Sequence, residues 1–250
     1  MKILLKRILF LVAVIALWQG VYSAGVFPDI AFPPPLDVYY ALIEGFGDGT
    51  LTKALLASFK HLLYGLPISI VLGTSIGVLL AKSKQADETA GMYLIALQSI
   101  PSIAWVPLSL LLFGFNEMAV IFVVIIGGVF VMALNTRTAL RNVPSSFKKA
   151  ARTMGVNGLE LFFKVEIPAS VPHFMTGIRL AWAFSWRALM AGELLSNGPG
   201  LGYSLTYAFD FARVDVVMAI ILIIGVIGST VDHLVFSKLE KTVMKRWGLL

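Results

Sequence analysis

The sequence predicts an all-α polytopic membrane protein, and three observations lead to that fold class. Hydrophobic residues make up 58% of the 250 residues and charged residues only 14%, whereas an average soluble domain carries about 25% charged residues. The mean hydropathy is +0.86. The apolar residues also gather in runs of about 20, which is the length that a helix needs to cross ~30 Å of hydrocarbon.

Six such runs are expected to span the membrane. They cover Ile8–Val26, Ser58–Ala81, Tyr93–Phe113, Met118–Leu134, Met175–Leu195 and Val216–Phe236. Pro101 and Pro107 interrupt the third run, but proline is tolerated in a spanning helix when neighbouring groups satisfy the freed carbonyls. Because the loops between the runs are short, we expect one domain over residues 1–250.

The first run also fits a secretory signal. Lys2, Lys6 and Arg7 precede it, and the Val-Tyr-Ser sequence at 21–23 resembles a cleavage site. The apolar character continues through Phe27, so the run is long enough to span, which favours a membrane helix. The chain has no cysteine, which excludes disulfides and cysteine-based metal sites.

Between the first two runs, Asp29–Leu51 forms the longest loop on its side of the membrane. Its three consecutive prolines, Pro33 to Pro35, favour an extended backbone, so we interpret the loop as a stiff connector. The alternative is a landing surface for an external partner. Its acidic residues are Asp29, Asp37, Glu44 and Asp48.

The second run carries a stripe of small residues at every fourth position. Its members are Ser69, Gly73, Gly77 and Ala81. This spacing places them on one side of a helix, where another backbone can approach closely. We interpret the stripe as a helix-packing face, and we read Gly225 and Gly228 in the last run in the same way.

The distribution of lysine and arginine predicts the orientation. Fifteen of the 20 basic residues fall on one side if the N-terminus is inside: Lys2, Lys6, Arg7, Lys82, Lys84, Arg137, Arg141, Lys148, Lys149, Arg152, Lys164, Lys238, Lys241, Lys245 and Arg246. The positive-inside rule then places both termini in the cytoplasm. Anionic headgroups account for the net charge of +6, so no nucleic-acid partner is expected.

Residues 144–168, called here the 144–168 segment, are the main polar interruption. Ser145 is a plausible N-cap, and the run to Met154 has good helix formers. Gly155 stands where a left-handed residue would end the helix. The segment therefore begins with a helix of about nine residues.

A second short helix is expected to follow. Asn157 can cap it, Glu160 stands in capping-box position, and Pro168 should end or kink it. Apolar anchors flank both helices, at Phe147, Met154, Leu159 and Phe162. Such a pair suits a groove on another protein, or it lies on the bilayer with Lys148, Lys149 and Arg152 facing headgroups.

Spacing favours the first interpretation. The pattern Lys149-Ala150-Ala151, Gly155, Val165, Ile167-Pro168 resembles the Glu-Ala-Ala loop of permease subunits of bacterial ATP-binding-cassette importers. Four other stretches resemble the branch for nitrate, aliphatic sulfonates, taurine and bicarbonate: Ile100 to Leu108, Asn135-Thr136-Arg137, Gly177-Ile178-Arg179 and Gly200-Leu201-Gly202-Tyr203. The similarity runs from Leu55 to the C-terminus, with Lys149 in place of the usual Glu.

The resemblance implies a type I importer permease fold with cytoplasmic coupling helices between the fourth and fifth spans, in a prokaryotic inner membrane. It implies two permease copies, as a homodimer or a heterodimer, two ATPase subunits that bind ATP and Mg²⁺, and an external solute-binding protein. The chain has no Gly-Lys dipeptide, so it holds no phosphate loop of the GxxxxGK[ST] kind and is expected to be non-catalytic. The expected solute is a small anion, or else another small organic solute.

Pathway candidates come from charges inside the spans, because such charges are costly. Arg187 lies about 12 residues beyond Met175, roughly 18 Å along the helix. It can attract an anion or form a structural pair with Glu193. Trp105 and Gln98 of the third run are expected either to line the pathway or to pack against neighbouring helices. Arg179 is shallow and is interpreted as structural.

Two other function classes fit less well. A membrane-embedded enzyme normally needs clustered Asp, His or Ser, and the sequence shows no such cluster; His61, His173 and His233 are isolated, so no metal site is expected. An ion-coupled secondary carrier needs buried acids, for which only Glu193 and Asp232 qualify.

Overall fold

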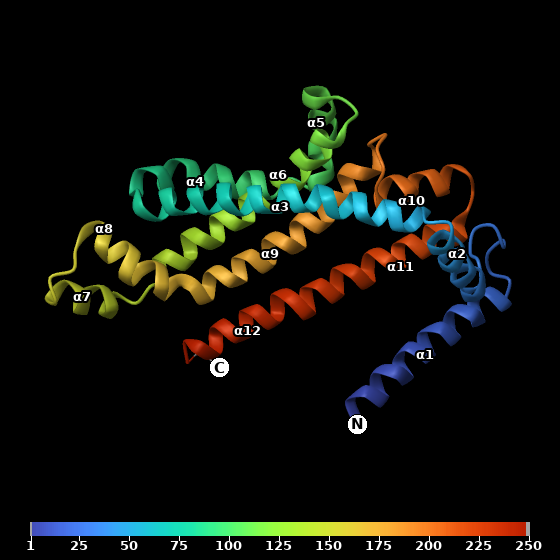
Figure 1. Ribbon diagram of the computed structural model, residues 1–250, viewed down its shortest axis with the longest axis horizontal. Coiled ribbons are helices and arrows are strands. Elements are labelled where there is room, and N and C mark those ends of the chain that lie inside the picture. The colour runs from blue at the N-terminus through green and yellow to red at the C-terminus, as the bar shows by residue number, and fades with distance from the viewer. Residues whose placement is uncertain (1, 249–250) are drawn as a thin grey trace. The chain divides into compact units, whose positions relative to one another are not determined.

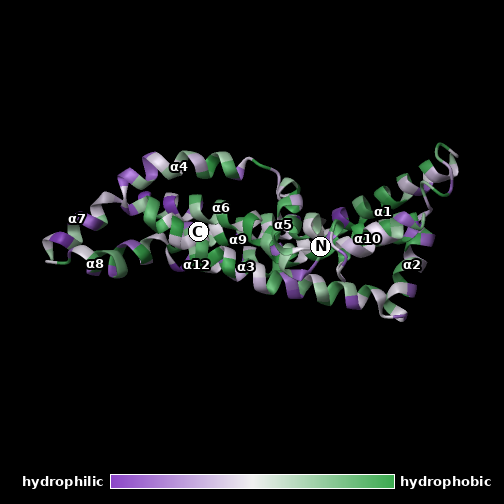
Figure 2. Ribbon diagram, turned by 90° about the horizontal axis from the view of Figure 1, so that it is seen from above, coloured by the Kyte–Doolittle hydropathy of each residue, from purple (hydrophilic) through white to green (hydrophobic). Residues whose placement is uncertain are grey.

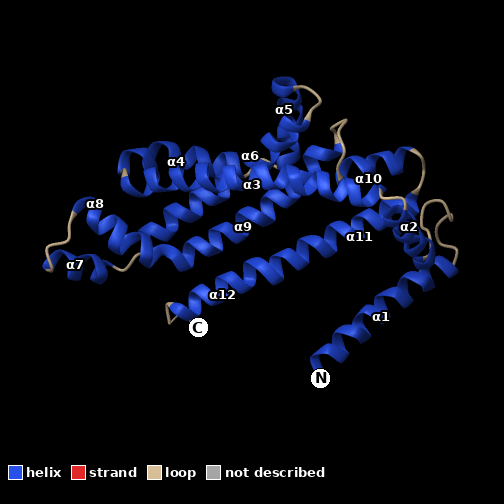
Figure 3. Cartoon of the chain, in the orientation of Figure 1, coloured by secondary structure: helices blue, strands red, loops and turns tan. Residues whose placement is uncertain are grey.

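The computed structural model describes residues 2–248, with side chains from residue 5 onward, and every regular element in that part of the chain is helical (Figures 1 and 3). The elements are α1 (Lys2–Ser23), α2 (Pro35–Gly47), α3 (Thr50–Lys82), α4 (Lys84–Gln98), η1 (Ser102–Trp105), α5 (Val106–Phe113), α6 (Glu117–Arg141), α7 (Ser145–Thr153), α8 (Gly158–Leu161), η2 (Phe162–Glu166), α9 (Ile167–Leu194), α10 (Leu201–Asp210), α11 (Val214–Val231), η3 (Asp232–Phe236) and α12 (Ser237–Arg246). The predicted all-α class is confirmed.

Two compact units divide the chain. Unit 1 comprises the residues up to Ser58 together with Pro199–Val226. Unit 2 comprises Phe59–Gly198 together with the residues from Ile227 onward. The single domain expected over residues 1–250 stays a prediction, and each unit is described by itself.

Four helical stretches of the described chain are long and apolar enough to cross a membrane: Leu5–Ser23, Thr50–Lys82, Glu117–Arg141 and Val214–Arg246. They contain the predicted second, fourth and sixth spans and overlap the first, Ile8–Val26, which extends three residues beyond the end of α1. The predicted fifth span lies in α9, which is a continuous helix of 28 residues. The charges of Arg179, Arg187 and Glu193 make α9 less apolar than the other four. The count of six spans therefore stays a prediction.

The third predicted span, Tyr93–Phe113, is interrupted at Pro101, as the prolines in this run predicted. The chain bends by 100° between α4 and the helical pair Ser102–Phe113. Pro101 explains the break, since it has no N–H to donate and it disfavours helical geometry at Ile100. The region is a broken span or a re-entrant loop, which brings the end of α4 and the start of α5 together.

In unit 2, the small stripe of α3 packs against α6, as predicted. A Cβ added to Gly73 would lie 2.6 Å from the Cβ of Met132, and one added to Gly77 would lie 2.5 Å from the carbonyl oxygen of Ala133. A Cβ added to Gly228 would lie 2.7 Å from the Nε1 atom of Trp186, whereas one added to Gly225 would meet nothing within 4 Å. The packing interpretation therefore holds for the stripe and for Gly228, and fails for Gly225 within the described chain.

The core of unit 2 lies between α6 and α9. Val131 and Met132 of α6 pack against Ala181 of α9. Further along the same two helices, Val123 of α6 packs against Ala188 of α9. Figure 2 shows that α6 and α9 are largely hydrophobic, while hydrophilic residues gather on α7 and at the start of α4. The polar 144–168 segment thus connects the two helices that form this core.

In unit 1, the prediction that Asp29–Leu51 is an extended connector is wrong for most of the segment. Its central part is the helix α2, which begins at Pro35. Pro34 is extended, with ψ of 157°, as three prolines predict, but proline also fits the first turn of a helix, where its missing N–H costs nothing. Val38 and Ala41 of α2 then pack against Ala219 of α11.

Candidate functional site

The first half of the 144–168 segment forms the predicted helix. α7 has nine residues, and Gly155 follows it with φ of +86°. Gly155 N–H donates to the Arg152 carbonyl and Val156 N–H donates to the Ala151 carbonyl, each at 3.0 Å. This is a Schellman motif, which satisfies the last carbonyls of the helix. The helix begins one residue earlier than predicted, so Ser145 is its first residue and Pro144 its cap.

The second half begins as predicted but ends differently. α8 starts after Asn157, yet the Asn157 side chain makes no capping bond and donates instead to the Gly155 carbonyl at 3.2 Å. Glu160 pairs with Lys164 at 2.6 Å, so the predicted capping box is wrong. The helix also does not end at Pro168.

A π-turn, η2, carries the helix through to α9. Ile167 N–H donates to the carbonyl of Phe162, five residues back, and Pro168 lies in the first turn of α9. Proline is tolerated in the first turn of a helix, so Pro168 fits this position. The 144–168 segment is therefore joined to α9 as one helical path.

Glu166 holds the segment together. Its buried carboxylate pairs with Lys82 at the end of α3, and the Nζ atom of Lys148 on α7 lies 3.4 Å from its other oxygen. Burial opposes ionisation of Glu166, but the two lysines outweigh it and hold the pKa of that carboxyl below its usual value. Lys82 also lies 4.3 Å from the ring centre of Phe162. The sequence analysis missed Glu166, although it is one of only two acids in the segment.

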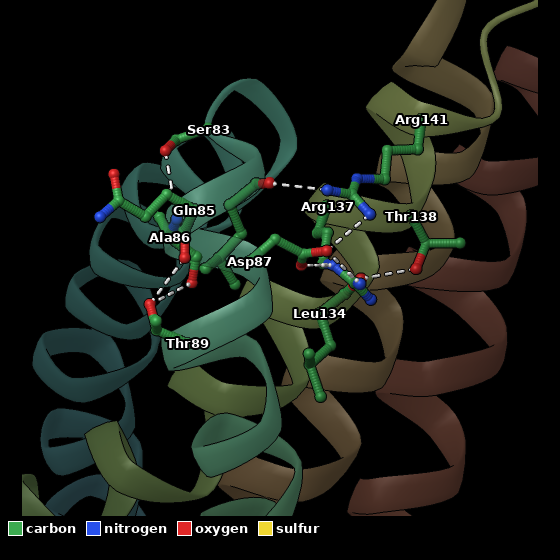
Figure 4. Close-up of polar contacts among 10 residues, drawn as sticks. Ser83, Gln85, Ala86, Asp87, Thr89, Leu134, Arg137, Thr138 and Arg141 are labelled. Carbon is green, nitrogen blue, oxygen red and sulfur yellow. Dashed lines mark hydrogen bonds and ion pairs between the residues drawn. The ribbon is translucent and has the colours of Figure 1, made fainter.

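A second charged cluster ties three helices together (Figure 4). Asp87 of α4 accepts hydrogen bonds from the Nη2 atom of Arg137 at 2.8 Å and pairs with Arg141 at 2.7 Å, both on α6. Arg141 also donates to the carbonyl of Leu80 on α3. Arg137 belongs to the Asn-Thr-Arg stretch that carries the resemblance. The cluster fixes the ends of α3, α4 and α6 beside the 144–168 segment.

The predicted coupling residues occupy two environments. Ala151 is buried at 3% exposure, while Val165 is half-buried. Exposed members are Lys149, Ala150, Gly155, Ile167 and Pro168. Three apolar side chains beside them are also exposed: Phe147 at 54%, Met154 at 76% and Leu159 at 76%. The segment therefore presents an outward surface of small, basic and large apolar residues.

Three of the four pathway candidates meet at one cavity, which we call the Arg187 cavity. Gln98, Trp105 and Arg187 line a space of about 200 Å³ where the chain bends between α4 and α5. Its walls also include Ser99, Ser102, Phe130 and Phe184. Arg187 donates through Nε to the Ala183 carbonyl, and its guanidinium carbon lies 4.6 Å from the ring centre of Phe184. Arg187 is exposed, so its guanidinium is accessible at the cavity wall.

Glu193 does not join the other candidates. It is fully buried, and one carboxylate oxygen lies 2.9 Å from Nδ1 of His61 on α3. The two residues of the pair are 132 positions apart, so no local signal could have joined them.

Arg179 has a structural role, as predicted. It donates to both carboxylate oxygens of Asp232 at 2.7 and 2.8 Å and to Glu240 at 2.9 Å. These pairs tie α9 to η3 and α12. Bidentate pairs of this kind fix geometry as well as charge. In the part of the chain that the structure describes, no three metal-ligating side chains lie together.

Comparison with known proteins identifies what this chain is similar to. A family model described as "Binding-protein-dependent transport system inner membrane component" matches residues 69–240. A putative ABC transporter permease protein of Methanocaldococcus jannaschii is 36% identical over 188 residues, which cover 75% of this chain and 70% of that protein. The putative aliphatic sulfonates transport permease protein SsuC of Bacillus subtilis is 30% identical over 241 residues, 96% of this chain and 87% of its own length.

A nitrate permease and a solved transporter structure are also similar to this chain. The nitrate import permease protein NrtB of Leptolyngbya laminosa is 30% identical over 192 residues, 76% of this chain and 69% of that protein. Among solved structures, an inward-facing conformation of the MetNI methionine ABC transporter superposes with a TM-score of 0.66 at 18% identity, covering 78% of this chain and 96% of that chain. The structural likeness shows a shared fold.

Proposed function

Because this chain belongs to the family of inner membrane components of binding-protein-dependent transport systems, we propose that it is the permease subunit of an ATP-driven importer for a small anion. The observation that supports an anionic solute is the Arg187 cavity. Arg187 is the one charged side chain among the described residues that line it. A cation held at a partly apolar wall attracts an anionic solute more strongly than it would in water.

The chemistry of the cavity suits an anion with a few polar oxygens. Guanidinium groups bind planar oxyanions through two parallel N–H donors. Gln98 adds an amide, and Ser99 and Ser102 add hydroxyls from the bend between α4 and α5. Nitrate, sulfonate, taurine and bicarbonate all present such oxygens. A different small organic solute is the second candidate, supported by the aromatic wall of Trp105, Phe130 and Phe184.

The motor acts through the 144–168 segment. Two cytoplasmic ATPase subunits bind ATP and Mg²⁺, and each contacts one permease copy through the exposed coupling residues Lys149, Ala150, Gly155, Ile167 and Pro168. Ala151 is buried and Val165 half-buried, so these two support the contact from within the chain. Closure of the ATPases moves α7 as a rigid body, and the Glu166 contacts with Lys82 and Lys148 pass that movement to α3. The helical path through η2 passes it to α9, which carries Arg187. Alternating access then follows as a two-state change.

Orientation and partners complete the proposal. The protein lies in the inner membrane of a prokaryote with both termini and the 144–168 segment in the cytoplasm, as the positive-inside rule favours. A second permease copy, most simply an identical one, completes the pathway. An external solute-binding protein delivers the solute on the opposite side.

Uptake in proteoliposomes tests the function. The permease is reconstituted with its ATPase and the loaded binding protein, and labelled nitrate, bicarbonate, taurine and an alkanesulfonate are offered in turn. We expect ATP-dependent uptake of one of these anions, with no uptake when the ATPase is omitted. Uptake driven by a proton or sodium gradient alone would overturn the assignment as an ATP-driven importer. Uptake of uncharged solutes, with no uptake of these anions, would overturn the proposal that the solute is an anion.

A further inference from the structure

The last helix, α12, carries four exposed basic side chains, called here the α12 basic cluster. They are Lys238, Lys241, Lys245 and Arg246. None of the four forms an ion pair with a side chain of the described residues. The one acid of α12, Glu240, is buried and accepts hydrogen bonds from Arg179 and Thr176 of α9. The cluster is therefore an unbalanced positive surface.

Other basic residues of unit 2 are neutralised by acids of the same chain. Glu166 pairs with Lys82 and Lys148, and Asp87 pairs with Arg141. These ion pairs connect helices of this protein to one another. Because the α12 basic cluster has no such internal partner in the described structure, its charges are available to an anionic group from outside the chain.

Three of the lysines share one face of α12. Lys238, Lys241 and Lys245 recur at spacings of three and four residues, which places them beside one another on a helix. Ser237 and Glu240, which are buried against the rest of the chain, lie on a different face. Like charges at this spacing destabilise a helix. An anion bound between the lysines would relieve the repulsion and accept charge-assisted hydrogen bonds.

The position of the cluster along the chain matches the depth of phospholipid headgroups. α12 ends the helical stretch Val214–Arg246, which is long and apolar enough to cross a membrane. Lys241 lies five residues beyond Phe236, the end of the predicted sixth span, which is about 7–8 Å along a helix. The headgroup layer on each side of the hydrocarbon is about 5–8 Å thick. Leu234 and Leu239 are about half exposed beside the cations, where acyl chains would cover them.

α12 is also fixed to α9, so a ligand on α12 would stabilise more than one helix. Arg179 of α9 donates to Glu240 at 2.9 Å. At the end of α12, the indole N–H of Trp247 donates to the carbonyl of Pro168 at 3.0 Å. Tryptophan is enriched at the membrane–water interface. A lipid that binds the folded arrangement should therefore raise the stability of the whole protein.

We propose that the α12 basic cluster binds the phosphate headgroups of anionic phospholipids in the cytoplasmic leaflet. This inference rests on the proposed function for the side of the membrane on which α12 lies. Four or more Lys and Arg residues directly after a spanning helix are typical of anionic-lipid binding, and each one near the surface strengthens it by roughly fivefold.

Thermal unfolding of the purified full-length permease in neutral detergent tests the site. Short-chain phosphatidylglycerol is the anionic probe, and short-chain phosphatidylcholine is the reference without net charge. The test variant combines Lys238→Gln, Lys241→Gln and Lys245→Gln. The matched control combines Lys53→Gln, Lys84→Gln and Lys164→Gln, which removes the same charge from three exposed lysines outside the cluster.

Phosphatidylglycerol should raise the melting temperature of wild type and control by at least about 5 °C, at a lipid concentration near 100 times the dissociation constant. Phosphatidylcholine should have little effect. The test variant should bind phosphatidylglycerol about a hundredfold more weakly and lose most of the shift. Lys241→Gln alone should weaken binding about fivefold, so the site can be tested even if the triple variant fails to fold. The wild-type shift should also shrink as salt rises from about 0.05 to 0.5 M.

Three results would overturn the lipid site: an equal phosphatidylglycerol shift in the test variant and wild type, an equal shift with phosphatidylcholine, or an equal shift with free glycerol phosphate. Weaker ATPase binding by the test variant, together with an unchanged phosphatidylglycerol shift, would assign the cluster to the ATPase instead. Each of these results leaves the proposed function intact if ATP-driven uptake persists. A phosphatidylglycerol shift without ATP-driven uptake would support the site and contradict the proposed function.

Discussion

Lys148 of α7 lies 3.4 Å from a carboxylate oxygen of Glu166, in the turn that leads into α9. The same carboxylate pairs with Lys82 at the end of α3. One acid thus links an outward-facing helix to two long helices. A movement of α7 away from Glu166 would stretch or break this contact, so we expect coupling to be sensitive to substitution of Glu166.

Replacing Glu166 by Gln should uncouple the motor while leaving membrane insertion intact. The side-chain volume is kept, but two lysines lose their shared counter-charge. The expected loss of stability is about 1–2 kcal/mol, because both lysines keep part of their hydration. Solute-stimulated ATP hydrolysis should fall by about tenfold, the factor that 1.4 kcal/mol produces. The measurement is ATPase activity with and without the loaded binding protein.

Glu160→Gln is the matched control. It removes the same charge from an exposed pair with Lys164 on one helical turn, which contributes only about 0.3–0.5 kcal/mol. We expect normal stimulation. If Glu160→Gln and Glu166→Gln behaved alike, the link through Lys148 and Lys82 would have no part in coupling.

Acid pH should remove the contribution of Glu166 to stability. The pKa of this carboxyl is lowered in the folded protein, so its stabilising effect is complete above the usual carboxyl value of about 4.3 and is lost as the pH falls through the folded-state value. Thermal unfolding of wild type and Glu166→Gln in detergent should therefore differ at neutral pH and converge as the pH falls through the lowered pKa of Glu166. A difference that grew on acidification would contradict the ion-pair account.

The sequence predicted those features whose cause is local. Gly155 ends α7 because only the residues next to it are involved, and the stripe of Gly73 and Gly77 follows from spacing on one helix. Ion pairs between residues far apart in the sequence could not be predicted in this way. Glu166 is 84 positions from Lys82, and Glu193 is 132 positions from His61, so only the fold could show that each acid has a basic partner.

The effect of proline could be predicted at Pro101 but only in part at Pro35 and Pro168. The triplet ending at Pro35 predicted an extended connector, although proline also begins helices. Pro168 was expected to end or kink a helix, and the helix instead continues through a π-turn into α9. Pro101 was expected to kink a span, and the chain bends there by 100°. The effect of proline depends on which neighbouring carbonyls find other donors, and that is set by tertiary packing.

Gly155→Val should weaken coupling through backbone strain alone. Gly155 has φ of +86° and nothing lies within 4 Å of a Cβ added there, so the substitution creates no clash. A left-handed conformation costs a branched residue about 1–2 kcal/mol, which would loosen the Schellman motif after α7. Transport-stimulated ATP hydrolysis should drop, and Gly155→Asn should be milder because Asn tolerates this conformation. Equal activity of all three proteins would remove the turn from the coupling path.

Gly77→Ala should destabilise the packing of α3 on α6. The new Cβ would lie 2.5 Å from the carbonyl oxygen of Ala133, and overpacking of this kind costs about 1–3 kcal/mol. Gly225→Ala is the control, because its Cβ meets nothing within 4 Å and alanine favours a helix by about 1 kcal/mol. Thermal unfolding in detergent should separate the two variants. Equal melting temperatures would show that the α3 stripe tolerates wider spacing.

Arg187→Ala should reduce anion uptake without reducing ATPase binding. Arg187 is the charged group at the wall of the Arg187 cavity, and it lies more than one helical turn from the buried pair of His61 and Glu193. Loss of a charge-assisted contact to an anion costs about 1.5–3 kcal/mol, which corresponds to at least about tenfold in apparent affinity. Uptake at a series of solute concentrations measures that change, and co-purification of the ATPase reports the unaffected partner contact. Arg187→Lys keeps the charge but not the planar fork, so it should recover part of the uptake. Unchanged transport by Arg187→Ala would place the solute path elsewhere.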